Sequence, residues 1–92
     1  MRVLYQRTAQ RDIEGIYAYI AKDNPDDAIR VVERIRAAIE MLADHPHIGR
    51  PGRKSGTREL VAAHLHYVVP YRVVGNEVRI VRVLHPAQQW PR

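Results

Sequence analysis

Apolar side chains recur at helical spacing near the start of the chain. From residue 8 to about residue 22 they fall on one helical face: Ala9, Ile13, Ile16, Tyr17 and Ile20. This pattern predicts an amphipathic helix with Thr8 as its N-cap. Gly15 lies inside that helix and costs about 1 kcal/mol relative to alanine. The close approach of another backbone would explain why a glycine is there.

A second helix is predicted to begin just after Asn24. Asn24 suits the N-cap, Pro25 suits the first helical position, and two aspartates follow where the helix dipole favours negative charge. One face of the segment is then apolar: Ala28, Val31, Val32, Ile35, Ala38, Ile39 and Leu42. The helix should end near Asp44, because His45 precedes a proline. Two helices joined by so short a link form a hairpin.

Runs of apolar and β-branched residues predict strands elsewhere. A short strand is expected at residues 3–5, and three more at residues 58–61, 67–74 and 77–84. Gly75 and Asn76 suit a two-residue hairpin turn with glycine first. Pro70 predicts that its strand is bulged or has no neighbour on one side. Residues 47–57 show no periodicity and are expected to form a basic loop.

These elements predict an α+β fold in one domain, residues 1–92. An N-terminal strand and a helical hairpin would pack on an antiparallel sheet of three to four strands. The length of 92 residues allows one hydrophobic core. The longest uncharged run is too short for a membrane span, and no signal-peptide pattern opens the chain. We therefore expect a cytoplasmic protein without a membrane partner.

The positive charge is concentrated in the second half of the chain. Residues 1–46 hold seven Lys or Arg against eight Asp or Glu, whereas residues 47–92 hold eight against two. Such a distribution favours polyanions or an acidic protein as partners, although a surface that serves only solubility is the plain alternative. Arginine outnumbers lysine thirteen to two, which favours bidentate contacts to phosphates or carboxylates.

Three arginines interrupt the apolar strands at the C-terminal end: Arg72, Arg79 and Arg82. Arg79 and Arg82 point to opposite faces by the period-two rule, so one should lie on the face away from the helices. With Arg50, Arg53, Lys54 and His85 they could bind RNA phosphates or take part in acid catalysis at a phosphodiester. Alternatively they pair with Glu59, Glu77 or a partner's acids. Trp90 either packs on the core or anchors a partner.

The sequence gives little support for a metal site, a cofactor site or hydrolytic catalysis. His64, His66 and His85 could be imagined as metal ligands, but the chain has no cysteine and no recognised histidine spacing. We expect no metal and no cofactor. Glu59 is expected to pair with the adjacent Arg58. Serine-nucleophile and phosphate-cradle motifs are missing from the sequence.

An ordered set of short motifs resembles the RelE/ParE superfamily of bacterial toxins from type II toxin-antitoxin modules. The motifs are Asn24-Pro25 with Ala28, Gly49-Arg50-Pro51, Gly56-Thr57-Arg58-Glu59-Leu60, Tyr71-Arg72-Val73, and Arg82-Val83-Leu84-His85 with Gln88 and Trp90-Pro91. The resemblance implies a helical hairpin on an antiparallel sheet. It also implies a growth-inhibiting toxin that a small acidic antitoxin wraps and neutralises. The residues implied in target or antitoxin binding are Arg50, Arg53, Lys54, Arg58, Arg72, Arg82 and Trp90.

The superfamily divides by target. RelE-like members cut mRNA on the ribosome with basic residues, but those positions fall on Val68 and Gln88 here. Other ribonuclease members use a histidine where His85 stands, so a ribonuclease would use His85 with Arg72, Arg79 or Arg82, and Trp90 as a stacking aromatic. ParE-like members instead poison DNA gyrase without an assigned catalytic centre, and this branch is favoured. A nonspecific nucleic-acid-binding module is the third hypothesis.

Overall fold

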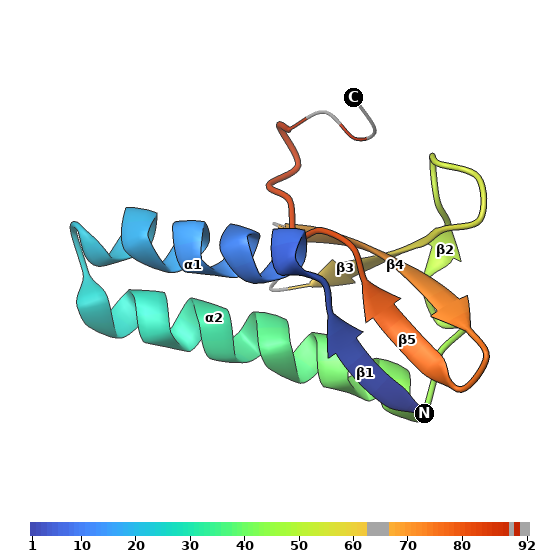
Figure 1. Ribbon diagram of the computed structural model, residues 1–92. Helices are drawn as coiled ribbons and strands as arrows, with labels where there is room; N and C mark the ends of the chain where they lie inside the picture. The colour runs from blue at the N-terminus through green and yellow to red at the C-terminus, as the bar shows by residue number, and fades with distance from the viewer. Residues whose placement is uncertain (63–66, 89, 91–92) are drawn as a thin grey trace.

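The chain folds into two layers, a helical hairpin and a five-stranded sheet (Figure 1). The computed structural model describes residues 1–62, 67–88 and 90. The elements in chain order are β1 (Arg2–Tyr5), α1 (Arg7–Ala21), α2 (Pro25–Glu40), the 3-10 helix η1 (Met41–Ala43), β2 (Arg50–Pro51), β3 (Arg58–Ala62), β4 (Tyr67–Val74) and β5 (Glu77–Ile80). The predicted α+β class and the helical hairpin are confirmed. Among the described residues, no helix is both long and apolar enough to cross a membrane.

The sheet is larger than predicted and is mixed. Its strand order is β1-β5-β4-β3-β2, and β1 runs parallel to β5, whereas the other neighbours are antiparallel. The parallel pair is possible because the whole hairpin and the three strands β2, β3 and β4 separate β1 from β5, so the chain returns to β1 by a long crossover. The extra strand is β2, in which Arg50 faces Glu59 and Pro51 faces Arg58. Part of the predicted basic loop is therefore a sheet edge.

A β-bulge explains the proline in the central strand. Tyr71 faces Ile80, whereas Val68 faces Leu84, so the segment after β5 carries one extra residue between these pairs. The Pro70 carbonyl accepts hydrogen bonds from Val81 N at 2.9 Å and Arg82 N at 3.5 Å. A bulge was expected in the strand that carries Pro70, whereas the extra residue belongs to the segment that faces this strand. The regular strand β5 accordingly ends at Ile80 and not at Leu84.

The two helices begin differently. The Asn24 side chain accepts a hydrogen bond from Asp27 N at 3.0 Å, which confirms Asn24 as the N-cap of α2. The prediction that Thr8 caps α1 is wrong, because α1 already begins at Arg7 and its N-cap position, Gln6, makes no side-chain cap bond. The Thr8 hydroxyl instead donates to the Val81 carbonyl at 2.7 Å. It ties the start of α1 to the segment that follows β5.

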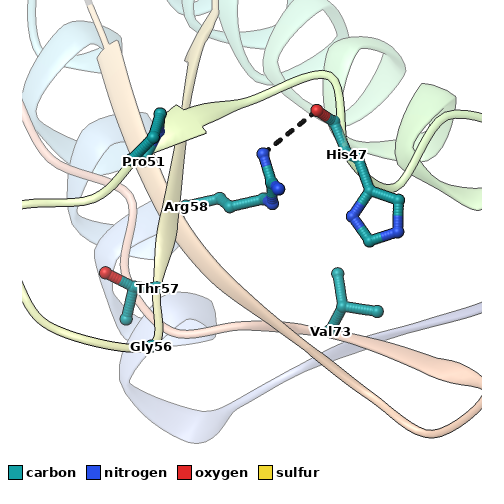
Figure 2. Close-up of a pocket in the computed structure, with 6 residues that line it drawn as sticks. All are labelled: His47, Pro51, Gly56, Thr57, Arg58 and Val73. Atoms are coloured by element: carbon teal, nitrogen blue, oxygen red, sulfur yellow. Dashed lines mark hydrogen bonds between the residues drawn. The ribbon is translucent and has the colours of Figure 1, made fainter.

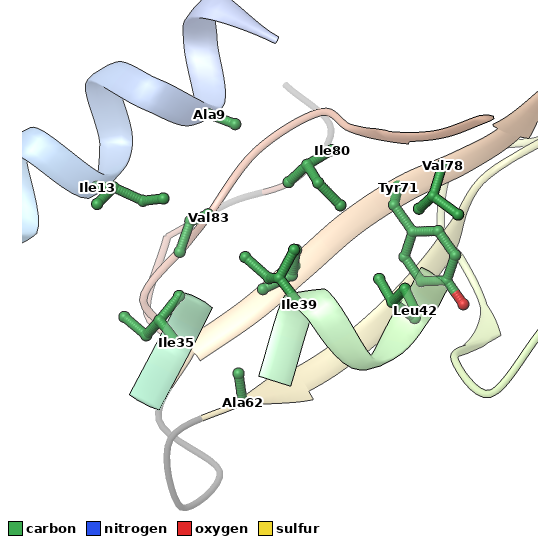
Figure 3. Close-up of a cluster of buried hydrophobic side chains, with 11 residues drawn as sticks. Ala9, Ile13, Ile35, Ile39, Leu42, Ala62, Tyr71, Val78, Ile80 and Val83 are labelled. Carbon is green, nitrogen blue, oxygen red and sulfur yellow. The ribbon is translucent and has the colours of Figure 1, made fainter. Parts of the chain in front are cut away.

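The core lies between the hairpin and one face of the sheet (Figure 3). Its buried members are Ala9, Ile13, Ile35, Ile39, Leu42, Ala62, Val69, Tyr71, Val78, Ile80 and Val83. Burial of each large apolar side chain contributes roughly 1.5 to 3 kcal/mol. Tyr71 is fully buried, and its hydroxyl donates to the Pro46 carbonyl at 2.8 Å and accepts from Gly49 N at 2.9 Å. Tyr71 thus fixes the loop that leads from η1 into β2.

Two glycines occupy distinct environments. Gly75 has a φ of 58°, as the predicted hairpin turn requires. Gly15 is exposed on α1, and apart from its chain neighbours and the backbone of its own helix no described atom lies within 4 Å of the point where its Cβ would be. The described part of the chain therefore makes no close approach to Gly15.

Candidate functional site

The sheet face opposite the helices, called here the far face, brings several of the predicted arginines together. Tyr71 and Ile80 point into the core, so alternation along the strands directs Arg72 and Arg79 to the far face. The two arginines face one another directly in the β4–β5 register. Like charges at such a position destabilise a sheet unless anions neutralise them. The far face therefore has the electrostatics of an anion-binding surface.

Only one of these two arginines has an acidic partner among the described residues. Arg79 binds Glu77, with Nε at 3.2 Å and Nη2 at 3.1 Å from the carboxylate, as the pairing alternative predicted. Arg2 reaches the same carboxylate at 3.6 Å. Arg72 forms no hydrogen bond or ion pair within the part of the chain that the structure describes. Its guanidinium keeps all its donors for a ligand.

Glu59 binds two arginines, Arg50 and Arg53, at one edge of the far face. Its buried carboxylate accepts from Arg53 N at 2.8 Å, Arg53 Nε at 3.2 Å and Arg50 Nη2 at 3.3 Å. Burial alone would raise the pKa of Glu59, but the hydrogen bonds from Arg53 and Arg50 outweigh it and lower the pKa below its usual 4.5. Both arginines remain half exposed, so each can still contact a partner.

Arg58 has a structural role that the sequence did not predict. The expected pair with Glu59 is absent from the described contacts, because neighbouring residues of β3 point to opposite faces. Arg58 Nη1 instead donates to the carbonyls of His47 at 3.2 Å and Gly49 at 2.8 Å. Figure 2 shows Arg58 in a shallow pocket of about 320 Å³, which is lined by His47, Pro51, Gly56, Thr57, Arg58 and Val73. Arg58 thereby fixes the loop before β2.

Arg82 is bound to α1 and not to the far face. Its Nε and Nη2 lie 2.7 Å and 3.0 Å from the two Asp12 oxygens, and Asp12 also accepts from Val83 N at 2.9 Å. The hydrogen bond to Asp12 raises the pKa of Arg82, against the opposing effect of burial. Arg79 therefore supplies the far-face arginine that the period-two rule predicted. Asp12 was missed, because 70 residues separate the partners and nothing local signals the contact.

The side chains of Trp90 and Lys54 contact each other beside the far face. Lys54 Nζ lies 5.7 Å from the centre of the Trp90 ring, a cation–π contact between the loop after β2 and the end of the chain. Trp90 is partly buried, and its indole N–H is buried without an acceptor among the described residues. An unsatisfied buried donor is costly. This cost is relieved if a partner supplies an acceptor.

His85 lies apart from the far-face arginines. Val68 and Leu84 pair on the far face, whereas the His85 ring contacts Tyr67 edge-on at 6.1 Å. His85 also lines a groove beside α1. Its Nδ1 accepts from Ala87 N at 3.2 Å, and its backbone N donates to Gln88 Oε1 at 2.8 Å. The ribonuclease set of His85 with Arg72, Arg79 and Arg82 is therefore not assembled in one place.

The residues that line this groove were not predicted from the sequence. It has a volume of about 650 Å³, and its lining comes from α1, the start of β4 and the segment after β5: Arg11, Asp12, Gly15, Ile16, Tyr19, Ile20, Tyr67, Val83, His85 and Gln88. A smaller pocket of about 290 Å³ next to it shares Arg11 and Asp12. The apolar periodicity of α1 predicted its buried face, but the groove needs the segment after β5 to lie alongside it.

The described residues show no metal centre. Within residues 1–62, 67–88 and 90, no cluster of three metal-binding side chains is present. His64 and His66, considered as ligands above, lie outside the described residues. The chemistry that the described site offers is the binding of anions and of apolar or aromatic groups.

The sequence is similar to known toxins over almost its whole length. A family model of the ParE toxin of the parDE type II toxin-antitoxin system matches residues 3–90. The putative toxin Y4kP of Sinorhizobium fredii is 48% identical over 91 residues, covering 99% of this chain and 94% of that protein. Toxin ParE1 of Caulobacter vibrioides is 35% identical, covering 86% of this chain and 82% of that protein. Toxin RelE2 of the same organism is 34% identical, with coverages of 95% and 97%.

Two solved structures share the fold. A chain of the chromosomal ParDE system from P. aeruginosa matches with a TM-score of 0.82 and 28% identity, covering 92% of this chain and 95% of that one. A chain of the toxin-antitoxin complex RelBE2 from Mycobacterium tuberculosis matches with a TM-score of 0.59 and 30% identity, covering 91% and 95%. The backbone is thus more similar to the ParDE chain than to the RelBE2 chain.

Proposed function

Because the chain belongs to the ParE toxin family of type II toxin-antitoxin systems, we propose that it inhibits growth by binding DNA gyrase and stalling the enzyme on cleaved DNA. In this proposal the chain is a binding inhibitor and not an enzyme. It acts in the cytoplasm, where gyrase works, and an acidic antitoxin neutralises it. The two similar structures come from toxin-antitoxin systems, which supports the antitoxin as partner.

The observation that carries this proposal is the separation of His85 from the far-face arginines. A ribonuclease needs an acid or base and a phosphate-stabilising cation at one scissile bond. His85 instead contacts Tyr67 beside the α1 groove, while Arg72 and Arg79 face away from the helices. Val68 is buried against Leu84, and Gln88 bonds the backbone of His85. These placements favour binding over catalysis.

The far face is the proposed surface for the target. Arg72 offers a guanidinium without an internal partner among the described residues. Arg50 and Arg53 extend the same charge along the edge, and Lys54 with Trp90 adds a cation and an aromatic ring beside it. Aromatic and arginine side chains are the residues that most often dominate protein interfaces. An acidic surface of gyrase, or the DNA phosphates beside it, would complement this charge.

Inhibition of gyrase supercoiling by the purified chain tests the proposal. The wild type should inhibit, and Arg72→Gln should raise the concentration for half inhibition by roughly tenfold, as expected when a charge-assisted contact of 1–3 kcal/mol is lost. Lys22→Gln is the matched control, because it removes the same charge from the exposed link between the helices. Unchanged supercoiling with a folded wild-type chain contradicts the proposal.

An mRNA interferase is the second candidate, since toxin RelE2 is about as similar in sequence as toxin ParE1. His85 is exposed and could approach RNA. This alternative predicts cleavage of ribosome-bound mRNA at fixed codon positions on expression of the chain. His85→Ala should abolish that cleavage. Intact mRNA during growth arrest excludes the alternative.

A further inference from the structure

The shallow pocket around Arg58 lies on the helix-facing side of the sheet, away from the far face. Arg58 faces Tyr71 in the β3–β4 register, and Val73 follows Tyr71 by two residues, so the three side chains share the side of the hydrophobic core. None of the described residues that line the pocket comes from a helix. The loop before β2 and the turn before β3 form its walls instead (Figure 2). The helices therefore leave this pocket uncovered.

Arg58 brings a positive charge into the pocket without a carboxylate to neutralise it. The residue is partly buried, and in the described part of the chain no acidic residue lines the pocket or pairs with it. Burial raises the pKa of Tyr71, and the Gly49 N–H together with the charge of Arg58 opposes that rise. A charge that is taken out of water is costly unless an opposite charge pairs with it. A bound anion would offset this cost.

The nitrogens of Arg58 are divided between a structural role and an unused edge. Nη1 donates to the carbonyls of His47 and Gly49, whereas Nε and Nη2 form no hydrogen bond within the described residues. Nε and Nη2 are the two nitrogens with which Arg82 binds both oxygens of Asp12. The edge that Arg58 leaves unused is therefore the one that grips a carboxylate at two points.

His47 offers a further donor at this pocket. Figure 2 shows its imidazole at the wall of the pocket, on the side toward which the Arg58 guanidinium points. The ring has no hydrogen bond or ion pair among the described residues. An imidazole N–H can donate to an oxyanion in either protonation state of the ring. Two side chains from different segments can thus bind one anion.

The size and the walls of the pocket indicate which anion fits. Val73 and Pro51 contribute apolar surface, and a volume of about 320 Å³ is near the lower end of the range of about 300 to 1,000 Å³ for ligand sites. A phosphate group carries about −1.5 to −2 charges at neutral pH, more than one guanidinium offsets. A carboxylate carries a single charge, and a short apolar stem behind it would contact Val73 and Pro51.

We propose that this pocket binds one carboxylate on a short apolar stem, with Arg58 as its two-point ligand and His47 as a second donor. Such a carboxylate belongs to a free small organic acid or to an acidic side chain of a protein. The site is separate from the far face and does not depend on the target proposed above. A bound carboxylate would also stabilise the loop before β2, since Arg58 holds that loop through Nη1.

Titration of the purified, ¹⁵N-labelled chain with butyrate tests the proposal by NMR. Butyrate should shift the Arg58 Nε–H resonance and the backbone resonances of Gly56, Thr57 and Val73. The dissociation constant should be on the order of 1 mM, as expected for one charge-assisted fork and a small apolar contact. Butyramide has the same stem without the charge and should produce no saturable shift. Absence of a saturable shift with butyrate overturns the inference.

Two variants assign the binding to the named side chains. Arg58→Gln should weaken butyrate binding about tenfold, whereas Arg30→Gln removes the same charge from an exposed position of α2 and should leave binding unchanged. His47→Ala keeps the backbone carbonyl that Arg58 binds, so the loop should stay in place. It should weaken binding about threefold, as expected for one lost hydrogen bond. Wild-type affinity in a folded Arg58→Gln or in His47→Ala overturns the inference.

Two further ligands identify the source of the carboxylate. A glutamate blocked by N-acetyl and α-amide groups presents the carboxylate as a protein side chain does. If it binds at least as tightly as butyrate, the pocket serves a protein partner, and if it binds more weakly, the pocket serves a free acid. Inorganic phosphate that binds more tightly than both overturns the choice of a carboxylate. Butyrate binding by a chain that does not inhibit gyrase would remove the proposed target and leave this inference standing.

Discussion

Single residues decide which of the many arginines can reach a partner. Glu59 holds Arg50 and Arg53 on the edge of the far face, and Asp12 holds Arg82 against α1. Each carboxylate also accepts a backbone N–H, so it fixes a loop as well as a side chain. Arg72 has no such partner among the described residues. It is therefore the arginine on which target binding should depend most.

The pH dependence of stability tests the role of Glu59. The folded-state pKa of Glu59 is lowered below 4.5, so its contribution is present above the unfolded-state pKa and is lost as the pH falls through the folded-state value. At neutral pH, Glu59→Gln should lower the free energy of unfolding by about 1.5 to 3 kcal/mol, because it leaves two arginines and a backbone N–H without an ionised acceptor. Urea denaturation at decreasing pH should show this difference shrinking.

Glu77→Gln is the matched control for that experiment. Its ion pairs with Arg2 and Arg79 are more exposed, and such pairs contribute about 0 to 1 kcal/mol. A difference between wild type and Glu59→Gln that stays constant into acid would contradict the assigned pKa shift.

Contacts between residues that are close along the chain could be predicted from the sequence. Arg79 and Glu77 are two residues apart on one strand face, so their pairing could be predicted. Asp12 and Arg82 could not be matched, because their contact exists only after the segment beyond β5 has packed on α1. The Glu59–Arg58 expectation failed for a local reason, since adjacent strand residues point to opposite faces.

The helices and strands begin and end where the sequence predicted when the residues that determine the boundary are close together in the chain. The cap at Asn24, Pro25 at the first helical position and the acidic first turn place the start of α2 correctly. The end of β5 was predicted too late, because residues 81–84 continue the apolar run although the bulge at Pro70 ends the regular pairing. The parallel β1–β5 pair was also missed, since a strand pattern contains no information about its partner. The order and direction of the strands are defined only once the long connection from β1 to β5 has folded.

Removal of the α2 cap should destabilise the helical hairpin. Asn24→Ala deletes the acceptor for Asp27 N and should cost about 1 kcal/mol. A domain of this size should then unfold about 4 to 8 °C lower in a thermal denaturation experiment. Asn24→Asp keeps a side-chain acceptor and serves as the control, with stability near that of the wild type. A Tm for Asn24→Ala equal to that of the wild type would show that the hairpin does not depend on this cap.

The whole molecule presents two surfaces that the sheet separates. The far face carries Arg72 and Arg79, whereas the groove beside α1 carries Gly15, Tyr19 and His85. The charge imbalance of the second half of the chain predicted a basic surface but not its division between two sides. The family resemblance found in the sequence is confirmed by the match over residues 3–90 and by the fold. The proposed function places target binding on the far face.

The most direct test of a binding inhibitor that needs no catalytic histidine compares the wild type with His85→Ala in one gyrase reaction. Supercoiled plasmid is incubated with gyrase and each chain, and detergent then releases any DNA that gyrase holds cleaved. We predict that both chains produce the same amount of linear plasmid at the same concentration, because His85 lies apart from the far face. Absence of linear plasmid with the wild type, together with loss of growth inhibition in His85→Ala, would contradict the account.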